Sequence, residues 1–289
     1  MNHINYSEAT LCTINGELAD HLPLSDRSVG YGHGLFETML FSGGKVALWP
    51  RHMRRLINDA GVLGIPVAES ALQGILSGFC ERLASQNVDA GTIKITVTAG
   101  SGGRGYRSPA LPNARIICQH FVPQPRNMHA ETSGLVLTEC VYRMPENPVL
   151  AGIKHLNRLD QIIARAEWAD EYDDGLMYSA NEHVIETTRA NIFMKIQGKW
   201  LTPGLDQSGV SGVMRGLLIE HLFPHCKLPV AIQTIERSEL SGISEIFCCN
   251  ALRGITPVIK IAGIGGWAVG EETKRLQKAL SELYDGYPC

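Results

Sequence analysis

Short apolar strands and two amphipathic helices alternate through the first 122 residues. Alternating apolar and polar positions, many of them β-branched, predict strands, which we place at residues 10–14, 35–41, 45–49, 92–99 and 114–122. Apolar residues at helical spacing predict helices at residues 51–62 and 70–85, and Pro50 suits the first turn of the earlier helix. Asn15-Gly16 predicts a hairpin turn, because both residues tolerate positive φ.

The rest of the chain again mixes the two periodicities. We expect strands at residues 134–142, 176–179, 183–186, 192–196, 200–202, 230–235 and 245–249. Leu159, Ile162, Ile163 and Ala166 predict the apolar face of a long amphipathic helix, and further helices are expected at residues 209–223 and 271–284. The predicted fold class is therefore α/β (α+β). Two domains are expected, residues 1–122 and 128–289, with a Pro-containing linker at 123–127.

Composition narrows the classes of function. A hydrophobic content of 44% with 19% charged residues indicates a globular protein with a substantial core. The net charge of −3 gives no sign of a nucleic-acid partner, and no apolar run approaches the roughly 20 residues of a membrane span. The eight cysteines form no CxxC pair, so they are interpreted as free thiols in a reducing cytoplasm, without a metal site.

The stretch from Ala151 to Leu159 holds the candidate for covalent chemistry, Lys154. It stands between a loop rich in Pro and Asn and a predicted helix. A lysine at such an edge can point into a cavity, where desolvation lowers its pKa by disfavouring the ammonium form. The neutral amine is a nucleophile and forms a Schiff base with an aldehyde cofactor. A surface lysine preceding a helix is equally compatible with this stretch alone.

A phosphorylated aldehyde cofactor would also need a carboxylate at its ring nitrogen and a cup for its phosphate. Glu186, at the end of a predicted strand, could keep a pyridine nitrogen protonated and so make the ring an electron sink, although glutamates at strand ends are commonly just exposed. Arg55 could turn inward as a phosphate clamp, since its planar fork matches phosphate oxygens, or remain a solvated charge. The helix start at Val213-Met214 and the turn at Asn250-Ala251-Leu252 could supply backbone N–H groups.

Residues 100–107 form a glycine-rich loop after the strand at 92–99. Its sequence, Gly-Ser-Gly-Gly-Arg-Gly-Tyr-Arg, combines a flexible backbone with Arg104, Tyr106 and Arg107. Such a loop is well suited to bind a carboxylate. An exposed hairpin loop without a ligand has the same composition.

Four stretches carry a family resemblance, namely Gly100 to Tyr106, Ala151 to Leu159, Leu205 to Val210 and Cys249 to Leu252. Through them the chain resembles the fold-type IV pyridoxal-phosphate enzymes, which include branched-chain and D-amino-acid aminotransferases and aminodeoxychorismate lyases. The similarity runs from about Ile14 to Val258 and is strongest to the lyases. Branched-chain aminotransferases carry a tyrosine five residues after the lysine, whereas this chain has Leu159, which favours the lyases.

The resemblance implies pyridoxal 5′-phosphate between the two domains of a homodimer. It implies Lys154 as the Schiff-base lysine, Glu186 as the partner of the pyridine nitrogen and Arg55 as a phosphate ligand. The helix start at Val213-Met214 and the turn at Asn250-Ala251-Leu252 would complete the phosphate cup.

The implied reaction converts 4-amino-4-deoxychorismate to 4-aminobenzoate and pyruvate, in folate biosynthesis, through an external aldimine and elimination. Thr38 matches a position of the lyases and is the candidate for helping Lys154 with proton transfer. Arg104, Tyr106 and Arg107 are the candidates for binding the substrate carboxylates. Two alternatives remain open: an aminotransferase on the same fold, and a cofactor-binding protein without turnover.

Overall fold

The computed structural model describes residues 8–109, 112–123 and 133–287. The chain divides into two compact units. The smaller unit comprises Met1–Pro125 together with Lys154–Asn157, and the larger comprises Arg126–Ile153 and Arg158–Cys289. The expected linker at residues 123–127 lies almost entirely outside the described residues. A four-residue segment from the middle of the chain therefore packs with the smaller unit.

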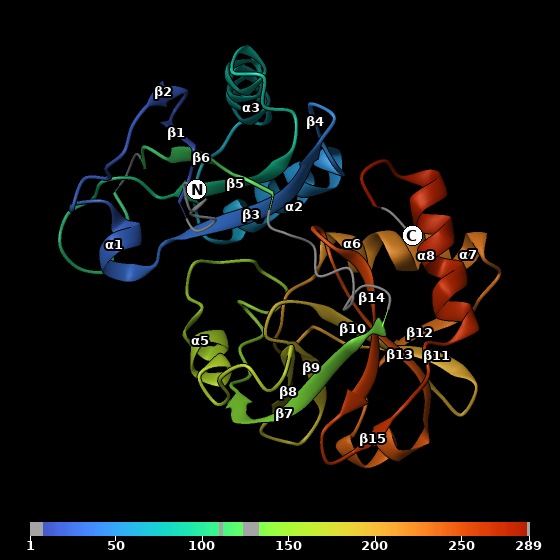
Figure 1. Cartoon of the computed structure of the whole chain (residues 1–289). Coiled ribbons are helices and arrows are strands. Elements are labelled where there is room, and N and C mark those ends of the chain that lie inside the picture. The colour runs from blue at the N-terminus through green and yellow to red at the C-terminus, as the bar shows by residue number, and fades with distance from the viewer. Residues whose placement is uncertain (1–7, 110–111, 124–132, 288–289) are drawn as a thin grey trace. The chain divides into compact units, whose positions relative to one another are not determined.

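A six-stranded antiparallel sheet forms the smaller unit, in the order β2-β1-β6-β5-β3-β4 (Figure 1). Its strands are β1 (Leu11–Ile14), β2 (Glu17–Leu18), β3 (Gly34–Ser42), β4 (Lys45–Val46), β5 (Gly91–Thr98) and β6 (Arg115–Phe121). Its helices are α1 (Arg27–Tyr31), α2 (Trp49–Val62) and α3 (Glu69–Ser85).

Strand β3 has two different faces. Leu35, Glu37, Met39 and Phe41 are buried, and the side chains between them are half-buried. Successive side chains of a strand point to opposite faces, so Phe36 and Thr38 share the second face. The buried face packs against the helical layer, because His52 and Arg55 of α2 bind Glu37.

A mixed sheet forms the larger unit, in the order β12-β11-β10-β13-β14-β7-β8-β9, with β15 paired to β14. Its strands are β7 (Leu135–Met144), β8 (Asp174–Ser179), β9 (Val184–Thr187), β10 (Asn191–Ile196), β11 (Lys199–Pro203), β12 (Val230–Gln233), β13 (Ile243–Asn250), β14 (Gly254–Ile261) and β15 (Gly265–Gly266). Its helical segments are α5 (Leu159–Arg165), α6 (Val213–Leu217), the π-helical η1 (Leu218–Leu222), α7 (Phe223–His225), the 3₁₀ turn η2 (Arg237–Gly242) and α8 (Glu271–Leu283).

Aromatic packing holds the helical run α6–η1–α7 against this sheet. The rings of Phe193, Trp200, Phe223 and Phe247 are almost completely buried. Ring centroids lie 5.1 Å apart for Phe193 and Phe247, and 5.3 Å apart for Phe193 and Phe223. Such pairs add about 0.5–1.5 kcal/mol each beyond the burial of their area. The start of α6 is thereby held in a fixed place over the sheet.

Two sequence-based expectations were wrong. The strand expected at residues 45–49 is shortened to Lys45–Val46, because Leu48 takes a φ of 55° and helix α2 already begins at Trp49. The long amphipathic helix expected after residue 158 is only the seven residues of α5. Its apolar side chains Leu159, Ile162 and Ile163 are 68%, 61% and 48% exposed, so they cover no core formed by the described residues.

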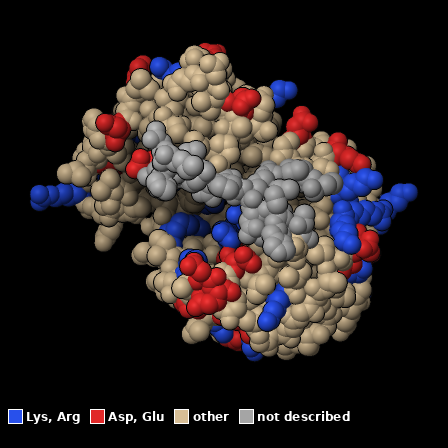
Figure 2. Space-filling model, in the orientation of Figure 1, with Lys and Arg blue, Asp and Glu red and all other residues tan. Residues whose placement is uncertain are grey.

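Charge is distributed without a dominant sign. On the face drawn in Figure 2, acidic and basic side chains form small separate groups, in agreement with the net charge of −3. Within residues 8–109, 112–123 and 133–287, no helix is both long and apolar enough to cross a membrane.

Candidate active site

The main chain around Lys154 pairs with the first residues of β3. The Phe36 N–H donates to the Lys154 carbonyl oxygen at 3.1 Å, and the Leu156 N–H donates to the Gly34 carbonyl oxygen at 2.9 Å. A β-bridge joins Leu35 and His155 between these two bonds. The segment thus extends the edge of a rigid strand, which fixes the backbone position of the lysine.

The side chain of Lys154 is half-buried over an aromatic ring. Its Nζ lies 4.2 Å from the centroid of the Phe36 ring, a contact that stabilises a cation on a ring face. Thr38 follows on the same face of β3, two residues along. Lys154 and Thr38, which were singled out in the sequence for one reaction, are therefore on the same side of the smaller unit's sheet.

Lys94 belongs to the same face and was missed in the sequence. It stands opposite Thr38 in the β3–β5 pairing, and its Nζ lies 5.4 Å from the Phe36 ring centroid. Burial lowers the pKa of the Lys94 ammonium below its usual range. The sequence signal was the position of Lys94 in the strand-like run Thr92-Ile93-Lys94-Ile95. Side-chain alternation in that run separates Lys94 from the apolar face of Ile93 and Ile95.

Arg55 is not a solvated charge. Its side chain is 12% exposed and forks onto Glu37, with Nε 2.7 Å from Oε1 and Nη2 2.5 Å from Oε2. The fully buried His52 contacts the same carboxylate, with Nδ1 2.6 Å from Oε2. Burial by itself would raise the pKa of Glu37, but Arg55 and His52 outweigh it and lower the pKa to about 2. This cluster orients the guanidinium of Arg55.

Glu186, on β9 of the larger unit, is only 4% exposed and so differs from an ordinary glutamate at a strand end. Its Oε2 accepts a hydrogen bond from Asn191 Nδ2 at 3.1 Å and another from the Val210 N–H at 3.0 Å. The Asn191 amide also donates to the Val210 carbonyl oxygen at 2.8 Å. The carboxylate is thereby held in one orientation.

The half-buried Arg158 and the buried Arg215 lie close enough to act electrostatically on Glu186. Burial lowers the pKa of both the Arg158 and the Arg215 guanidinium, while the charge of Glu186 raises it. Arg215 donates from Nε to Thr202 Oγ1 at 3.2 Å and from Nη2 to the Pro203 carbonyl at 2.8 Å. Their positive charges attract the carboxylate of Glu186. The sequence analysis assigned no role to either arginine, because Arg158 only belonged to the stretch around Lys154 and Arg215 only to a predicted helix start.

The start of α6 lies next to the Glu186 cluster. A Cβ on Gly212, the N-cap of α6, would lie 2.0 Å from Asn191 Oδ1, so a larger residue there would displace the Asn191 amide. The first N–H groups of a helix have no partner within the helix, and here they belong to Val213 and Met214. Asn191 therefore connects the helix start to Glu186, a role that the sequence did not reveal.

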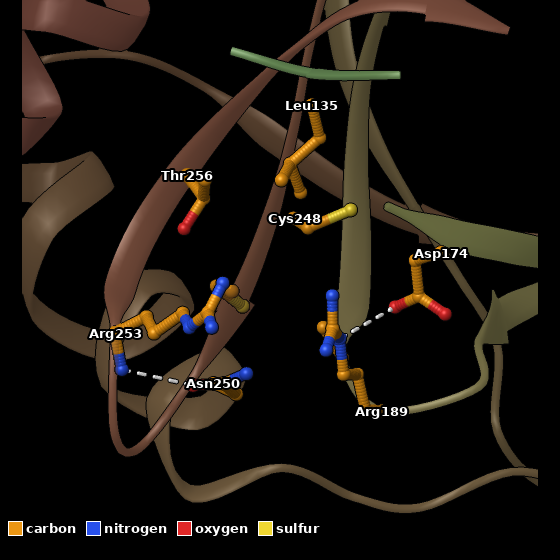
Figure 3. Close-up of a pocket in the computed structure, with 9 residues that line it drawn as sticks. Leu135, Asp174, Arg189, Cys248, Asn250, Arg253 and Thr256 are labelled. Atoms are coloured by element: carbon orange, nitrogen blue, oxygen red, sulfur yellow. Dashed lines mark hydrogen bonds and ion pairs between the residues drawn. The ribbon is translucent and has the colours of Figure 1, made fainter. Parts of the chain in front are cut away.

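The turn at residues 250–253 is closed by the side chain of Asn250. Its Oδ1 accepts hydrogen bonds from the Leu252 N–H at 3.1 Å and the Arg253 N–H at 2.9 Å. Figure 3 shows the Arg253 and Arg189 side chains extending toward a small cavity of about 10 Å³ beside this turn. The bonds fix the backbone of Ala251 and Leu252. A cavity of this size has room for about one water molecule.

The glycine-rich loop is organised by α1. The buried Arg27 donates from Nη1 to the Gly105 carbonyl and from Nη2 to the Tyr106 carbonyl, both at 3.1 Å. The Gly105 N–H donates to the hydroxyl of Tyr31 at 3.0 Å. Arg104, Tyr106 and Arg107 themselves are exposed. The loop backbone is therefore held while its side chains remain available.

The predicted residues fall into two groups. Lys154, Thr38, Arg55 and the loop of Arg104, Tyr106 and Arg107 belong to the smaller unit, and Glu186, Val213, Met214, Asn250, Ala251 and Leu252 belong to the larger. None of them lines the larger cavity, of about 570 Å³, beside α5. Among the described residues, no three His, Cys, Asp or Glu side chains gather so as to hold a metal ion.

Comparisons with known proteins place these residues in a family. The amino-transferase class IV model matches residues 34–261. The aminodeoxychorismate lyase of Vibrio harveyi is 33% identical over 274 residues, which cover 93% of this chain and 98% of the relative. The crystal structure of 4-amino-4-deoxychorismate lyase from Pseudomonas aeruginosa matches with a TM-score of 0.89 and 38% identity, covering 94% of this chain and 99% of the other.

A transaminase is also similar along most of the chain. The branched-chain-amino-acid aminotransferase of Escherichia coli strain K12 is 26% identical over 267 residues, covering 89% of this chain and 85% of the relative. The residues matched by the family model, 34–261, include Lys154 and Glu186. This chain belongs to the amino-transferase class IV family.

Proposed function

We propose that this protein is an aminodeoxychorismate lyase, which converts 4-amino-4-deoxychorismate to 4-aminobenzoate and pyruvate. The observation that carries the proposal is the similarity to two lyases, at 33% and 38% identity over 93% and 94% of this chain. The similarity to the aminotransferase is lower, at 26%. Leu159, where branched-chain aminotransferases carry a tyrosine, supports the same choice.

The residues present fit pyridoxal 5′-phosphate. This cofactor needs an amine for its aldehyde, a carboxylate for its ring nitrogen and N–H donors or cations for its phosphate. Lys154, the buried Glu186 and the helix start at Gly212 supply groups of these three kinds. When bound, the protonated pyridine ring would withdraw electrons from the carbon that bears the substrate amine.

Lys154 and Glu186 would have opposite tasks. Lys154 would hold the cofactor aldehyde until the substrate amine replaces it, and would then remove the proton from the amine-bearing carbon with its freed Nζ. The contact with the Phe36 ring would stabilise that amine in its protonated form. Glu186, held by Asn191 and the Val210 N–H, would keep its charge directed at the ring nitrogen.

Thr38 and Lys94 would assist at the leaving group. The hydroxyl of Thr38 lies on the face that carries Lys154 and is the candidate for passing a proton to the departing enol oxygen. General acid–base help of this kind is typically worth about 10²–10⁴ in rate. Lys94 adds a half-buried positive charge on the same face, suited to a substrate with two carboxylates.

The exposed side chains of the glycine-rich loop would bind the substrate. Arg104 and Arg107 can each form a two-pronged pair with a carboxylate, and the bonds from Arg27 hold the loop backbone in place. Tyr106 stacks edge-on against Tyr31, with centroids 5.8 Å apart, and would cover the bound ring.

The cofactor phosphate would be bound by three elements. Arg55, oriented by Glu37, would supply a positive charge. The N–H groups of Val213 and Met214 and the backbone of the turn at Asn250-Ala251-Leu252 would supply hydrogen bonds and the positive end of a helix dipole.

The protein would act as a homodimer. Leu159, Ile162 and Ile163 form an exposed apolar row on α5, and Val141 on β7 is also exposed. Contiguous apolar surface on a folded protein commonly marks an interface with another protein. Light scattering should therefore give about twice the 31.6 kDa of one chain.

A reducing compartment and a place in folate biosynthesis fit this activity. The seven cysteines in the described residues are all free thiols, as is usual for cytoplasmic proteins. The product, 4-aminobenzoate, is a building block of folate. We propose a cytoplasmic location, which the free thiols support.

A coupled assay tests the proposal. Chorismate, glutamine and an aminodeoxychorismate synthase would be supplied with this protein, and pyruvate and 4-aminobenzoate followed together. The lyase predicts that both products appear in equal amounts. Conversion of the bound cofactor to its amine form on adding amino acids, without either product, would instead identify an aminotransferase. Absence of all turnover would favour the cofactor-binding protein.

A further inference from the structure

The backbone of Lys154 is held by a side chain from outside its own segment. Asp59, on α2, accepts a hydrogen bond from the Lys154 N–H, with 3.2 Å between the nitrogen and Oδ2. The Lys154 carbonyl oxygen accepts from the Phe36 N–H at 3.1 Å. Both polar backbone groups of the lysine are thus occupied.

The environment of Asp59 does not favour a carboxylate, so stability of the fold does not explain this residue. It is half-buried, and in the described part of the chain its carboxylate accepts one hydrogen bond, which comes from Lys154. Burial raises the pKa of Asp59 to about 6, and the bond from Lys154 and the charge of Arg55 offset only part of that. The nearby carboxylate Glu37, by contrast, is paired with both Arg55 and His52. A desolvated carboxylate without such pairing costs free energy.

We propose that Asp59 is a positioning residue for Lys154, fixing the backbone from which the amine reaches the aldehyde of a cofactor. The inference rests on the proposed role of Lys154. The carboxylate acts through the backbone N–H and does not itself touch the reacting atoms. Without it, the Lys154 N–H would lose its carboxylate acceptor, and the amine would sample more positions.

Capture of pyridoxal by the protein stripped of cofactor tests the proposal. Pyridoxal carries the aldehyde without the phosphate, so its binding reports on the lysine and not on Arg55 or the phosphate cup. The dissociation constant would be measured by absorbance, and the modified residue identified by mass spectrometry after borohydride reduction. Lys154→Ala, which lacks the amine, is the control that should not bind pyridoxal covalently.

Asp59→Ala should raise the dissociation constant about tenfold, the usual effect of losing a hydrogen bond to a charged group. Asp59→Asn keeps an oxygen acceptor for the Lys154 N–H, so its dissociation constant should remain within about twofold of the parent value. Asn58→Ala, at the exposed neighbour on α2, should leave capture unchanged. If Asp59→Ala does not fold, Asp59→Ser, which has a shorter reach, replaces it.

Hydrogen exchange gives a second measurement that is independent of any cofactor. The Lys154 amide should exchange faster in Asp59→Ala than in Asp59→Asn. If Asp59→Ala and Asp59→Asn weaken pyridoxal binding equally, the effect is one of charge and the proposal is overturned. The proposal is also overturned if Asp59→Ala binds pyridoxal at Lys154 as tightly as the parent protein does. If pyridoxal does not react with Lys154 in the parent protein, the proposed function fails together with this inference.

Discussion

Lys154 and Glu186, the two groups proposed to act on the cofactor, are held in different ways. Lys154 is fixed through its backbone, by Phe36 and Asp59, while its amine lies over an aromatic ring. Glu186 is fixed through its side chain, whose Oε2 accepts bonds from Asn191 and the Val210 N–H. One contact pattern fixes the backbone that carries the functional group, and the other fixes the functional oxygen itself.

This difference matches the two tasks. A group that releases an aldehyde and then carries a proton must change position, and the bonds to Phe36 and Asp59 hold the backbone from which the Lys154 amine extends. A carboxylate that keeps a ring nitrogen protonated must stay directed at one atom, so the oxygen itself is bound. Electrostatic catalysis depends on such preorganised charges. Substitutions of Lys154 or Glu186, or of the residues that hold them, test this difference.

The largest effect is expected from Lys154→Ala. It removes the covalent attachment and the proton carrier together, so turnover should fall by more than about 10⁴-fold, above the range for acid–base help alone. The absorbance of the lysine-bound cofactor should disappear as well. Pyruvate release and the visible spectrum measure both, with Lys45→Ala on exposed β4 as the control. Substantial remaining activity would exclude Lys154 from the mechanism.

Glu186→Gln should have the next largest effect. The amide keeps the shape but loses the charge that stabilises a protonated ring nitrogen, so kcat should fall about 10²-fold or more, as for loss of a preorganised charge. Cofactor binding should change far less than kcat. Glu182→Gln, at the exposed turn before β9, is the matched control. An unchanged kcat would show that Glu186 only supports the fold.

Arg104→Ala should affect substrate binding. Loss of a two-pronged carboxylate contact should raise KM about tenfold with little change in kcat, the pattern for an interaction that is equally strong in the ground and transition states. The cofactor spectrum should not change. Arg54→Ala, on the exposed side of α2, serves as the control. If Arg104→Ala loses cofactor instead, the loop does not belong to the substrate.

The smallest effect concerns stability against pH. The folded-state pKa of Asp59 is raised from 3.8 to about 6, so its contribution to stability is fully present below pH 3.8 and is lost as pH rises through 6. Asp59→Asn should therefore gain stability relative to the parent between pH 4 and 7, by about 1 kcal/mol after allowance for solvent screening. Urea unfolding across this range measures the gain.

Glu37 provides the opposite case for that measurement. Its folded-state pKa is lowered from 4.5 to about 2, so its stabilising contribution is present above pH 4.5 and is lost as pH falls through 2. Glu37→Gln should therefore lower stability at pH 7, since it leaves Arg55 and His52 without their carboxylate.

A loss of stability in Asp59→Asn at pH 7 would contradict the idea that Asp59 is retained because it positions Lys154.

Much of this protein was determined by local sequence pattern. Alternation in residues such as Phe36 to Phe41 defined β3 and its two faces, and helical spacing defined α2, α3 and α8. The resemblance carried by the stretch around Lys154 and by the glycine-rich loop is confirmed by the family match and the lyase matches. The roles assigned to Lys154 and Glu186 remain predictions.

Only the tertiary structure decided which residues support those roles. Asp59 and Lys154 are 95 residues apart, and Arg55 and Glu37 are 18 apart on different elements. Periodicity reports which face of its own element a residue occupies, but it does not report which other element packs there. For the same reason the apolar pattern of Leu159, Ile162 and Ile163 correctly predicted a helical row, while its exposure depended on the absence of any partner element in the described chain.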